Sequence, residues 1–571
     1  MKPIDRSFHH TIQFLFKQLK GHRLQITLNI IIGVLFVFID LGFVWVTKLA
    51  VDIATHNSHV ATLQQAFILM ASIMLLRILL SICSRWIRAV LGVKAQNNMR
   101  IHLFARLLNS KWNAVRNFHT GNLTNRIEKD VTDVVNFITE SIPSLVTTIV
   151  QFLGAFFFLF YMDSMLAVII VCIIPFFILS SKIYVKRMKR LTHAIRGQES
   201  NIQSLIQETL QHNILVKTLD CFHTLTDNLH AQQTALHEKV IHRTKYSTVS
   251  TTLLSIGFAT GYFVTFAWGA TQLSNNLISY GAMLAFVQLV SQIQNPVRNM
   301  SRFVPIFINA FTATERLIEL DTIEQEQTAK NRVILSKATS ICFENISFRY
   351  TPTSRFIFEQ SNFKIPANGV TVITGETGTG KTTLIRLLLA IVEPTMGNIN
   401  LECKDGKMYT VNSSLRNNFA YVPQGNSLIS GSIKYNILLG NPNASDEDIR
   451  KALHTAGADF VLQKETGLET ICGETGDGLS EGQAQRIAIA RALVSNKMIF
   501  IFDEATSSLD NETEKIVLER IAQNYKDRTL IFITHRGEVL KYANQIIHLQ
   551  RQCCPKRFSI KTKKGSKAKV E

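Results

Sequence analysis

The chain has 571 residues, 46% of them hydrophobic, and a formal net charge of +19. This length exceeds one typical domain and this hydrophobic content is high for a soluble protein, so a membrane-embedded part is predicted. The eight cysteines are scattered without a C-x-x-C pair or metal-like spacing, which predicts ordinary reduced thiols. One alternative stays open: the vicinal Cys553 and Cys554 are either a soft-metal site or a chance pair.

Residues 1–23 carry no cleavable signal pattern, because Asp5 and His9 come early and no small-residue cleavage site follows a short apolar core. We therefore expect this segment to be retained. Its spacing predicts an amphipathic helix at the membrane surface. The residues of that pattern are Ile12, Phe14, Leu15, Phe16 and Leu19, with Lys17 and Lys20.

Six apolar stretches are long enough to be membrane spans. They cover residues 24–51, 61–84, 136–160, 165–181, 250–270 and 280–297. The connections at 52–62, 161–165 and 271–280 contain no Lys or Arg, whereas the segments from Arg85 and from Lys182 are basic. The positive-inside rule then places both chain ends in the cytoplasm. Because this topology explains much of the positive charge, we expect no nucleic-acid partner.

Two opposite charges lie deep within the first two spans, Asp40 and Arg77. Each would cost about 2.5 to 3.5 kcal/mol at a helix centre facing lipid. An ion pair between them would relieve this cost. Cavity lining and snorkelling are the alternatives.

The inner connections that begin at Arg85 and Lys182 are too long for turns and show helical apolar spacing, so helices are expected to continue below the membrane. A third long helix is expected to follow the sixth span to about Glu319. In that span Gln288, Ser291, Gln292 and Asn295 share one helical face. This face either lines a polar cavity or forms hydrogen bonds between helices.

From about residue 340 to 550, short β-rich runs alternate with helical patterns, which predicts a parallel sheet flanked by helices. The predicted order is therefore a transmembrane domain at 1–320, a linker at 321–339, an α/β domain at 340–550 and a basic, disordered tail at 551–571. The tail either contacts anionic lipid or is simply solvated.

A phosphate-binding loop is predicted between the strand-like run 370–374 and the helical run 384–392. Glycines let backbone N–H groups curl around a phosphate at a helix N-terminus, the lysine reaches the β- and γ-phosphates, and the final hydroxyl can ligate Mg²⁺. The loop consists of Gly375, Glu376, Thr377, Gly378, Thr379, Gly380, Lys381 and Thr382.

Two later strands are expected to end in chemically active side chains. The apolar run 498–502 is followed by Asp503 and Glu504, and the run 530–533 is followed by Thr534 and His535. Ligands of parallel sheets bind at the carboxyl ends of the strands. Asp503 is suited to hold Mg²⁺, Glu504 to polarise the attacking water, and His535 to contact the γ-phosphate.

The order of these motifs resembles that of an ATP-binding cassette (ABC) transporter, and specifically an exporter-type half-transporter, over about residues 10 to 550. The motifs are the loop from Gly375 to Thr382, Gln424, Leu-Ser-Glu-Gly-Gln at 479–483, Asp503-Glu504, Ser-Leu-Asp at 508–510, and His535. The resemblance implies an α-helical membrane domain of six transmembrane helices with long intracellular extensions, followed by an α/β phosphate-loop ATPase domain.

Site residues carried over by position fall into three groups. The catalytic ones implied are Glu504 and His535. The ATP-binding ones are Tyr350, residues 375–382 as named above, Thr383, Gln424, Ser480, Gly482, Gln483 and Asp510. The Mg²⁺-binding ones are Thr382, Gln424 and Asp503.

Segments that transmit motion are carried over in the same way. Residues 120–126 and 213–222 resemble the coupling segments, residues 473–476 resemble the segment that touches the intracellular helices, and Glu315-Arg316 resembles the end of the last long helix. One departure is Glu481, where the family usually has glycine; it places a carboxylate beside a γ-phosphate.

A single cassette in this family does not complete its own ATP site, so the resemblance implies a partner half-transporter, with a homodimer favoured over a heterodimer. The expected function is ATP-driven export of an unidentified substrate by alternating access, in a bacterial inner membrane among its lipids, with the ATPase domain in the cytoplasm. An ATP-gated channel or regulator is the alternative from another class. A lipid flippase or an exporter-fold importer is the alternative among transporters.

Overall fold

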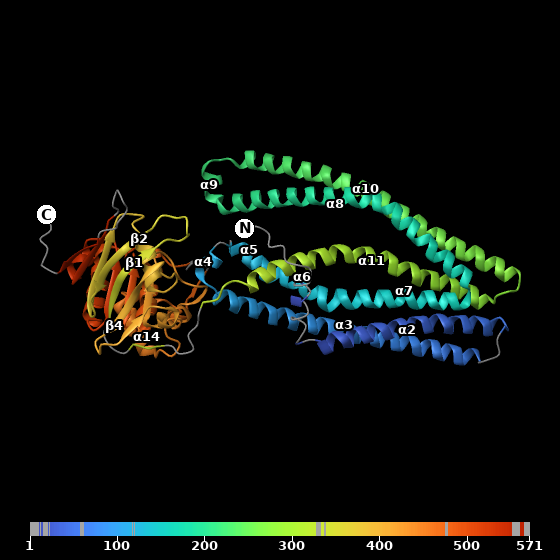
Figure 1. Ribbon diagram of the computed structural model, residues 1–571, viewed down its shortest axis with the longest axis horizontal. Coiled ribbons are helices and arrows are strands. Elements are labelled where there is room, and N and C mark those ends of the chain that lie inside the picture. Colours follow the sequence, from blue (N-terminus) through green and yellow to red (C-terminus); the bar gives the residue numbers. More distant parts are fainter. Residues whose placement is uncertain are drawn as a thin grey trace. The chain divides into compact units, whose positions relative to one another are not determined.

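A computed structural model describes residues 11, 13–14, 21, 23–57, 62–116, 118, 120–326, 333–335, 339–473, 478–550 and 560–564. The chain forms two compact units, which Figure 1 shows. One comprises residues 1–105 and 119–322, and the other comprises residues 106–118 and 323–571. The predicted amphipathic helix near residues 12–20 lies largely outside the described residues.

The first unit is helical. Its elements are α2 (Arg23–Ala54), α3 (Leu63–Leu108), α5 (Thr120–Asn125), η2 (Arg126–Asp130), α6 (Val131–Asn136), η3 (Phe137–Ser141), α7 (Ile142–Met162), α8 (Ser164–Gln211), α9 (Asn213–Thr218), α10 (Phe222–Ser274) and α11 (Tyr280–Asp321). The segments η2 and η3 are π-helical turns within one continuous helical stretch, residues 120–162. Among the described residues of this unit, six long helical stretches therefore follow one another, in the predicted order.

Within the described residues, four of these stretches are long and apolar enough to cross a membrane. They are Arg23–Ala54, Leu63–Leu108, Gly121–Met162 and Phe222–Ser274, and Ser164–Ile173 is a shorter apolar stretch. Their apolar side chains divide between a packed interior and an exposed outer surface. The interior joins α2, α7, α8 and α11 around Phe286, Leu289 and Ile293. Exposed residues such as Phe38, Leu79 and Phe263 face outward, as lipid-facing side chains do.

The predicted pairing of Asp40 with Arg77 is confirmed. Arg77 Nε lies 3.1 Å from Asp40 Oδ1, which joins α2 to α3. The Arg77 guanidinium also lies over the Phe36 ring, 5.4 Å from its centroid. Nearby, Ser84 donates a hydrogen bond to Asn29, so the same two helices share a second polar contact. The ion pair reduces the cost that either charge alone would carry in hydrocarbon.

The second unit is an α/β domain (Figure 1), and its described residues form three sheets. The six-stranded sheet has the order β12-β11-β3-β10-β9-β6, the four-stranded antiparallel sheet has the order β2-β1-β4-β5, and β7 pairs with β8. The strands are β1 (Thr339–Phe348), β2 (Phe358–Ile365), β3 (Gly369–Gly375), β4 (Met396–Cys403), β5 (Met408–Thr410), β6 (Phe419–Val422), β7 (Gly431–Ser432), β8 (Ile471–Cys472), β9 (Ile499–Asp503), β10 (Thr529–Ile533), β11 (Gln545–Leu549) and β12 (Ile560–Lys564).

Helices cover this framework. They are α4 (Trp112–Val115), α12 (Lys381–Leu388), α13 (Ile433–Leu438), α14 (Asp446–Thr455), α15 (Phe460–Gln463), α16 (Glu481–Val494) and α17 (Asn511–Asn524), with 3₁₀ turns η4 (Ser413–Asn418), η5 (Gly467–Glu469) and η7 (Glu538–Tyr542). The central strands β3, β10, β9 and β6 are parallel, and β9 and β10 are buried along their whole length. Because they run in register, their carboxyl ends meet at one edge.

Two boundaries differ from the sequence prediction. Residues 106–118, expected within the membrane domain, belong to the second unit, because the short helix α4 packs there through Trp112. The expected disordered tail contains a strand, since β12 pairs antiparallel with β11. Its alternation of Ile560 and Thr562 with lysines suits an edge strand, and the pairing satisfies the open edge of β11.

The ion pair between α2 and α3 generates a double-mutant prediction. Asp40→Asn and Arg77→Gln should each lower the melting temperature of the detergent-solubilised protein, because each leaves the other charge unpaired. The double variant should lose less stability than the sum of the singles, with a coupling of about 0.5 to 3 kcal/mol. As a control, Asp40→Asn combined with Lys94→Gln, an exposed change further along α3, should be additive. Strict additivity for Asp40 with Arg77 would contradict the pair.

Candidate functional site

The predicted phosphate-binding loop lies between the end of β3 at Gly375 and the start of α12 at Lys381. Gly375, Gly378 and Gly380 have φ angles of +154°, +83° and +100°. A side chain on Gly375 would also come within 2.5 Å of the Leu549 carbonyl oxygen. These positions require glycine, and the curled backbone that they allow leads directly into the positive N-terminus of a helix.

Lys381 lies at the centre of a cluster of polar groups. Its Nζ donates to the carbonyl of Gly375 at 2.5 Å and to that of Glu376 at 3.2 Å, and lies 2.8 Å from His535 Nε2. Burial lowers the pKa of the Lys381 ammonium, against the opposing effect of the nearby Glu504 and Asp503 carboxylates. Among the described residues no carboxylate is in direct contact with this cation, which leaves it available to a phosphate.

Asp503 and Glu504 emerge from β9 at the same edge. Asp503 is buried, and it accepts a hydrogen bond from the Tyr421 hydroxyl at 3.2 Å. Burial raises the pKa of Asp503 most, although the bond from Tyr421 opposes this rise. The same environment raises the pKa of the Tyr421 hydroxyl, chiefly through burial, so the tyrosine stays protonated as a donor.

Glu504 has an unusual backbone conformation, with φ of +49°. This left-handed conformation is strained for a residue with a side chain, and such strain clusters at functional sites. It is held in place by a hydrogen bond from the Glu504 N–H to the Ile533 carbonyl at 2.9 Å. The carboxylate accepts a hydrogen bond from Gln424 Nε2 at 2.8 Å and lies 3.8 Å from His535 Nε2. The structure thus brings Lys381, Gln424, Glu504 and His535 together.

The residues of the Leu-Ser-Glu-Gly-Gln motif form a separate group. Ser480 caps α16 by accepting from the Gln483 N–H, and the Gln483 side chain accepts from the Ser480 N–H in return. Gly482 lies so close to the Ser508 carbonyl that a Cβ would come within 2.9 Å. Asp510 caps α17 by accepting from the Thr513 N–H, and this hydrogen bond lowers the pKa of Asp510. Residues 474–477, which include most of the predicted segment 473–476, lie outside the described residues.

Tyr350 belongs to a stack of aromatic rings and arginines that sequence reasoning did not anticipate. Its hydroxyl lies 3.2 Å from Thr383 Oγ1 and accepts a hydrogen bond from Arg386 at 2.7 Å. The Arg386 and Arg116 guanidinium groups lie 4.5 Å and 5.1 Å from the centroid of the Trp112 ring. Arg116 also lies 5.5 Å from the Tyr350 ring. The tryptophan at position 112, in a basic inner connection, was the available signal.

A second set of contacts ties residues 106–118 to the segment after α11. Ser110 and Gln325 form an isolated antiparallel bridge, and Lys111 pairs with Glu324 at 2.5 Å. Glu326 in turn accepts hydrogen bonds from both ends of the Arg416 guanidinium, at 2.9 Å and 3.2 Å. The predicted coupling segment at 120–126 comprises α5 and the first residue of η2 in the helical unit, and its coupling role stays a prediction.

Two family models match this chain. The model of the ABC transporter transmembrane region matches residues 26–297, and the model described as ABC transporter matches residues 358–507. The first model corresponds to the helical unit, and the second corresponds to the unit that carries the motifs at the sheet edge. The chain belongs to the ABC transporter family, with a membrane domain fused to one ATPase domain.

Relatives and a solved structure match almost end to end. An ATP-dependent lipid A-core flippase of Albidiferax ferrireducens is 28% identical over 84% of this chain and 83% of its own length. A protein of Staphylococcus aureus named for multidrug export is 27% identical over 93% of each chain. A bacterial Atm1-family ABC exporter with ATP bound has the same fold, with a TM-score of 0.77 and 22% identity over 92% of this chain and 93% of that one. The protein is therefore an ABC exporter, an ATP hydrolase coupled to transmembrane transport.

The burial of Asp503 generates a pH prediction. Its pKa in the folded state is raised above the unfolded value, so its favourable contribution to stability is present at low pH and is lost as pH rises through the folded pKa. Asp503→Asn should therefore raise the melting temperature of the protein without nucleotide or metal at pH 8, and the gain should shrink towards pH 5. Asp527→Asn, at an exposed carboxylate, is the control. A lower melting temperature for Asp503→Asn at pH 8 would contradict the argument.

Proposed function

We propose that this protein exports its substrate by alternating access, as a dimer in which each ATP site is completed by the partner chain. The observation that carries the proposal is the separation of two groups of site residues. Lys381, Gln424, Glu504 and His535 contact one another, whereas the Ser480 cap contacts only Gln483 among the site residues whose contacts are described. Ser480 is exposed at a helix N-terminus, which is a suitable surface for the phosphates held by a second copy.

We assign roles at the sheet edge as follows. The phosphate loop, with Lys381 and Thr383, holds the nucleotide, and Tyr350 contacts its base. Glu504 polarises the attacking water, and His535, 3.8 Å from it, orients this carboxylate and contacts the γ-phosphate. The strained backbone of Glu504 and the bond from Gln424 support a poised carboxylate.

The residues Thr382, Gln424 and Asp503 fit a magnesium ion. They offer hydroxyl, amide and carboxylate oxygens, which are the donors that Mg²⁺ prefers, and the buried carboxylate of Asp503 would gain a countercharge. When bound, the ion would neutralise charge on the β- and γ-phosphates. Asp503 and Thr382 would hold the ion. Gln424 would respond to its presence while keeping its hydrogen bond to Glu504.

Coupling to the membrane domain is assigned to two short segments. Residues 106–118 reach Tyr350 through Arg116 and Trp112. Binding of a nucleotide base at Tyr350 would therefore affect this segment. The helix α9 carries apolar side chains that are largely exposed, with 82% of Ile214 and 53% of Leu215 accessible. A connection that stays in water would not expose apolar side chains to this extent. We therefore infer that α9 docks on the partner's ATPase domain.

A lipid flippase is the second candidate, because one relative is named for that activity. An ATP-gated channel is disfavoured by an intact set of hydrolytic side chains. For location, we propose a bacterial inner membrane with the ATPase domain in the cytoplasm, supported by the basic residues that follow the second and fourth predicted spans. Lipid-stimulated ATP hydrolysis in proteoliposomes would separate a flippase from an exporter of water-soluble compounds.

The role of Glu504 is tested by Glu504→Gln, which preserves shape and removes the base. Turnover of ATP should fall about 10²- to 10⁴-fold, the usual contribution of a positioned base. ATP binding should persist, as measured by equilibrium binding. Glu519→Gln, at an exposed glutamate of α17, should leave turnover near that of the wild type. Unchanged turnover in Glu504→Gln would reject the assignment.

The dimer is tested by complementation between two inactive variants. Lys381→Ala removes phosphate charge and Ser480→Arg blocks the exposed cap, so each alone should be inactive. A mixed dimer has one site with both defects and one with neither, and random pairing should make about half of the dimers mixed. Dimers isolated with a different tag on each variant should recover part of the ATPase activity.

Two outcomes of that experiment would contradict the proposal. Mixed dimers that form but stay inactive would contradict the proposal that one intact composite site hydrolyses ATP independently of the other. Failure of any mixed dimer to form, in preparations where each chain is folded, would contradict the homodimer and indicate a different partner half-transporter.

A further inference from the structure

A buried ion pair joins the two segments that follow the proposed hydrolytic residues. Glu514 of α17 has only 1% of its side chain exposed, and Arg536 Nη1 lies 2.9 Å from its Oε2. The other carboxylate oxygen of Glu514 accepts a hydrogen bond from Thr506 Oγ1 at 2.7 Å. Thr506 comes two positions after Glu504, and Arg536 comes directly after His535. The pair therefore connects the segment after β9 to the segment after β10.

The Arg536 guanidinium has further acceptors on the backbone. Nη1 also donates to the Leu509 carbonyl at 2.9 Å, and Nη2 donates to the Ser507 carbonyl. The Ser507 N–H in turn donates to the Glu504 carbonyl at 3.1 Å. Because a guanidinium presents its donors in a rigid fork, these contacts fix the direction of the side chain as well as its distance.

The backbone turn that carries His535 is closed at the same residue. The Arg536 N–H donates to Thr534 Oγ1 at 3.0 Å, and Thr534 is buried at the end of β10. Arg536 is thus held through its N–H to the end of β10 and through its side chain to the segment 506–510. Its position sets that of His535, the residue before it.

A third anchor comes from α16. Gln485 is buried, its Nε2 donates to Ser507 Oγ at 3.3 Å, and its Oε1 accepts from the Ser508 N–H at 3.2 Å. The segment 506–510 is therefore fastened from α16 as well as from Arg536. Loss of the Arg536 contacts would leave that segment in place and would shift His535 instead.

A buried ion pair is a poor means of stabilising a domain. Removing two charges from water offsets most of their attraction, and apolar side chains of similar volume are often as stabilising. An apolar pair cannot, however, direct hydrogen bonds from one planar group to a carboxylate and two carbonyls. The pair of Arg536 and Glu514 is therefore suited to fixing geometry rather than to adding stability.

We propose that Arg536 is a positioning residue for ATP hydrolysis: its guanidinium, held by Glu514, keeps the His535 imidazole in place at the sheet edge. The proposal rests on the role given above to His535 in the proposed function. His535 Nε2 lies 3.8 Å from Glu504 Oε1 and 2.8 Å from Lys381 Nζ, so a small displacement changes both contacts.

Binding of ATP does not depend on this pair. In the described part of the chain, the hydrogen bonds of Arg536 and Glu514 do not reach the phosphate loop at 375–382. A defect at Arg536 therefore lowers kcat and leaves the binding of nucleotide intact.

The first test is Arg536→Lys, measured on the full-length protein in lipid nanodiscs. Lysine keeps a positive charge beside Glu514 but lacks the fork that reaches the two carbonyls. The value of kcat should fall about ten- to hundredfold, because a displacement of about 1 Å at a reacting group costs that much. The KM for ATP and the number of ATP-binding sites should stay within about twofold of the wild type.

The matched control is Arg520→Lys. Arg520 lies on α17, pairs with Asp459 at 3.6 Å and donates to the His454 carbonyl, so it also contacts a carboxylate and the backbone. Its substitution should leave kcat at the wild-type value. Wild-type kcat in Arg536→Lys would overturn the proposal, as would a loss of kcat that only matches a loss of ATP-binding sites.

A double-mutant cycle tests whether Arg536 acts through His535. Residual hydrolysis is followed with radiolabelled ATP in His535→Ala and in the variant that combines it with Arg536→Lys. In the background without the imidazole, Arg536→Lys should lower kcat by less than about threefold, because residues that act as a unit are not additive. A fall by the same factor in both backgrounds would indicate a merely structural role and would overturn the proposal.

A third variant separates position from stability. Arg536→Met, Glu514→Leu and Thr506→Val together replace the polar network by apolar side chains. The melting temperature should stay near that of the wild type, because such replacements are often neutral. The value of kcat should nevertheless remain at least about tenfold below the wild type. Wild-type kcat in this variant would overturn the proposal.

Failure of this proposal is distinguishable from failure of the proposed function. Glu504→Gln is measured in parallel, in the same nanodiscs. If Glu504→Gln loses turnover while Arg536→Lys keeps it, the positioning role is overturned and the proposed function stands. If Glu504→Gln keeps its turnover, the roles proposed at the sheet edge are overturned, and the positioning role with them.

Discussion

The structure of the ATPase domain depends on the parallel register of β3, β9 and β10. Because these strands run side by side in the same direction, the segments that follow each of them meet at one edge. The phosphate loop follows β3, Asp503 and Glu504 complete and follow β9, and His535 follows β10. Three segments spread over more than 150 residues of the chain thereby meet, and Lys381 lies within hydrogen-bonding distance of His535, 154 positions later.

Burial and shared hydrogen bonds determine how readily the groups at that edge ionise. Lys381, the Asp503 carboxylate and the Glu504 carboxylate carry one positive and two negative charges, and burial opposes ionisation of Lys381 and Asp503 alike. Burial of these charged groups carries an electrostatic cost, which a bound nucleotide and its metal would reduce. The strained φ of Glu504 is a second cost at this edge. Strain of this kind persists only where the surrounding structure enforces it.

Sequence reasoning was most successful where a local pattern determines structure. Glycine spacing around residue 378 predicted the loop, and continuous apolar runs ending in Asp503 and Thr534 predicted strand ends at one edge. Opposite charges at Asp40 and Arg77 predicted an ion pair, because membrane burial leaves few alternatives. The family, the fold class and the ATPase activity followed from the order of those motifs, and the comparisons confirm them.

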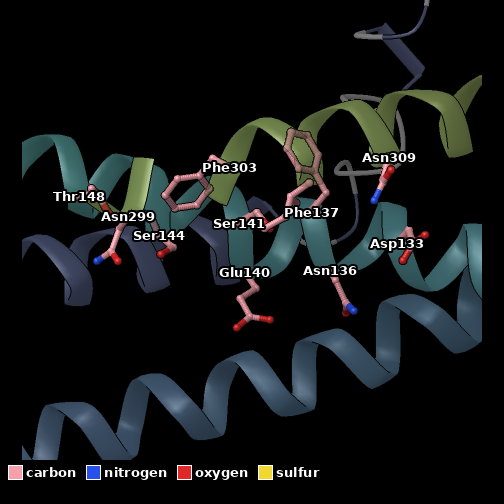
Figure 2. Close-up of a pocket in the computed structure, with 11 residues that line it drawn as sticks. Asp133, Asn136, Phe137, Glu140, Ser141, Ser144, Thr148, Asn299, Phe303 and Asn309 are labelled. Carbon is pink, nitrogen blue, oxygen red and sulfur yellow. Dashed lines mark hydrogen bonds between the residues drawn. The ribbon is translucent and has the colours of Figure 1, made fainter. Parts of the chain in front are cut away.

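What sequence reasoning missed depends on contacts between distant segments. Nothing local in Trp112 indicates that it packs with Arg386, 274 positions later, or that residues 106–118 leave the helical unit. The strand at residues 560–564 was missed because its lysines suggested a solvated tail, whereas an open edge of β11 made pairing favourable. The polar face of Gln288, Ser291, Gln292 and Asn295 stays a prediction: Asn295 donates to Ser291 of the same helix, and Asn299 and Phe303, further along α11, line a pocket (Figure 2).

The claim that ATP draws two copies of this chain together is tested most directly by a distance measurement between the copies. A nitroxide label on Glu512→Cys, an exposed position beside Asp510, in a background without the native cysteines, reports one distance per dimer by pulsed electron resonance. The account predicts that a non-hydrolysable ATP analogue with Mg²⁺ shortens this distance to a single narrow population. An unchanged distance, or no distance between chains in protein that still hydrolyses ATP, would contradict it.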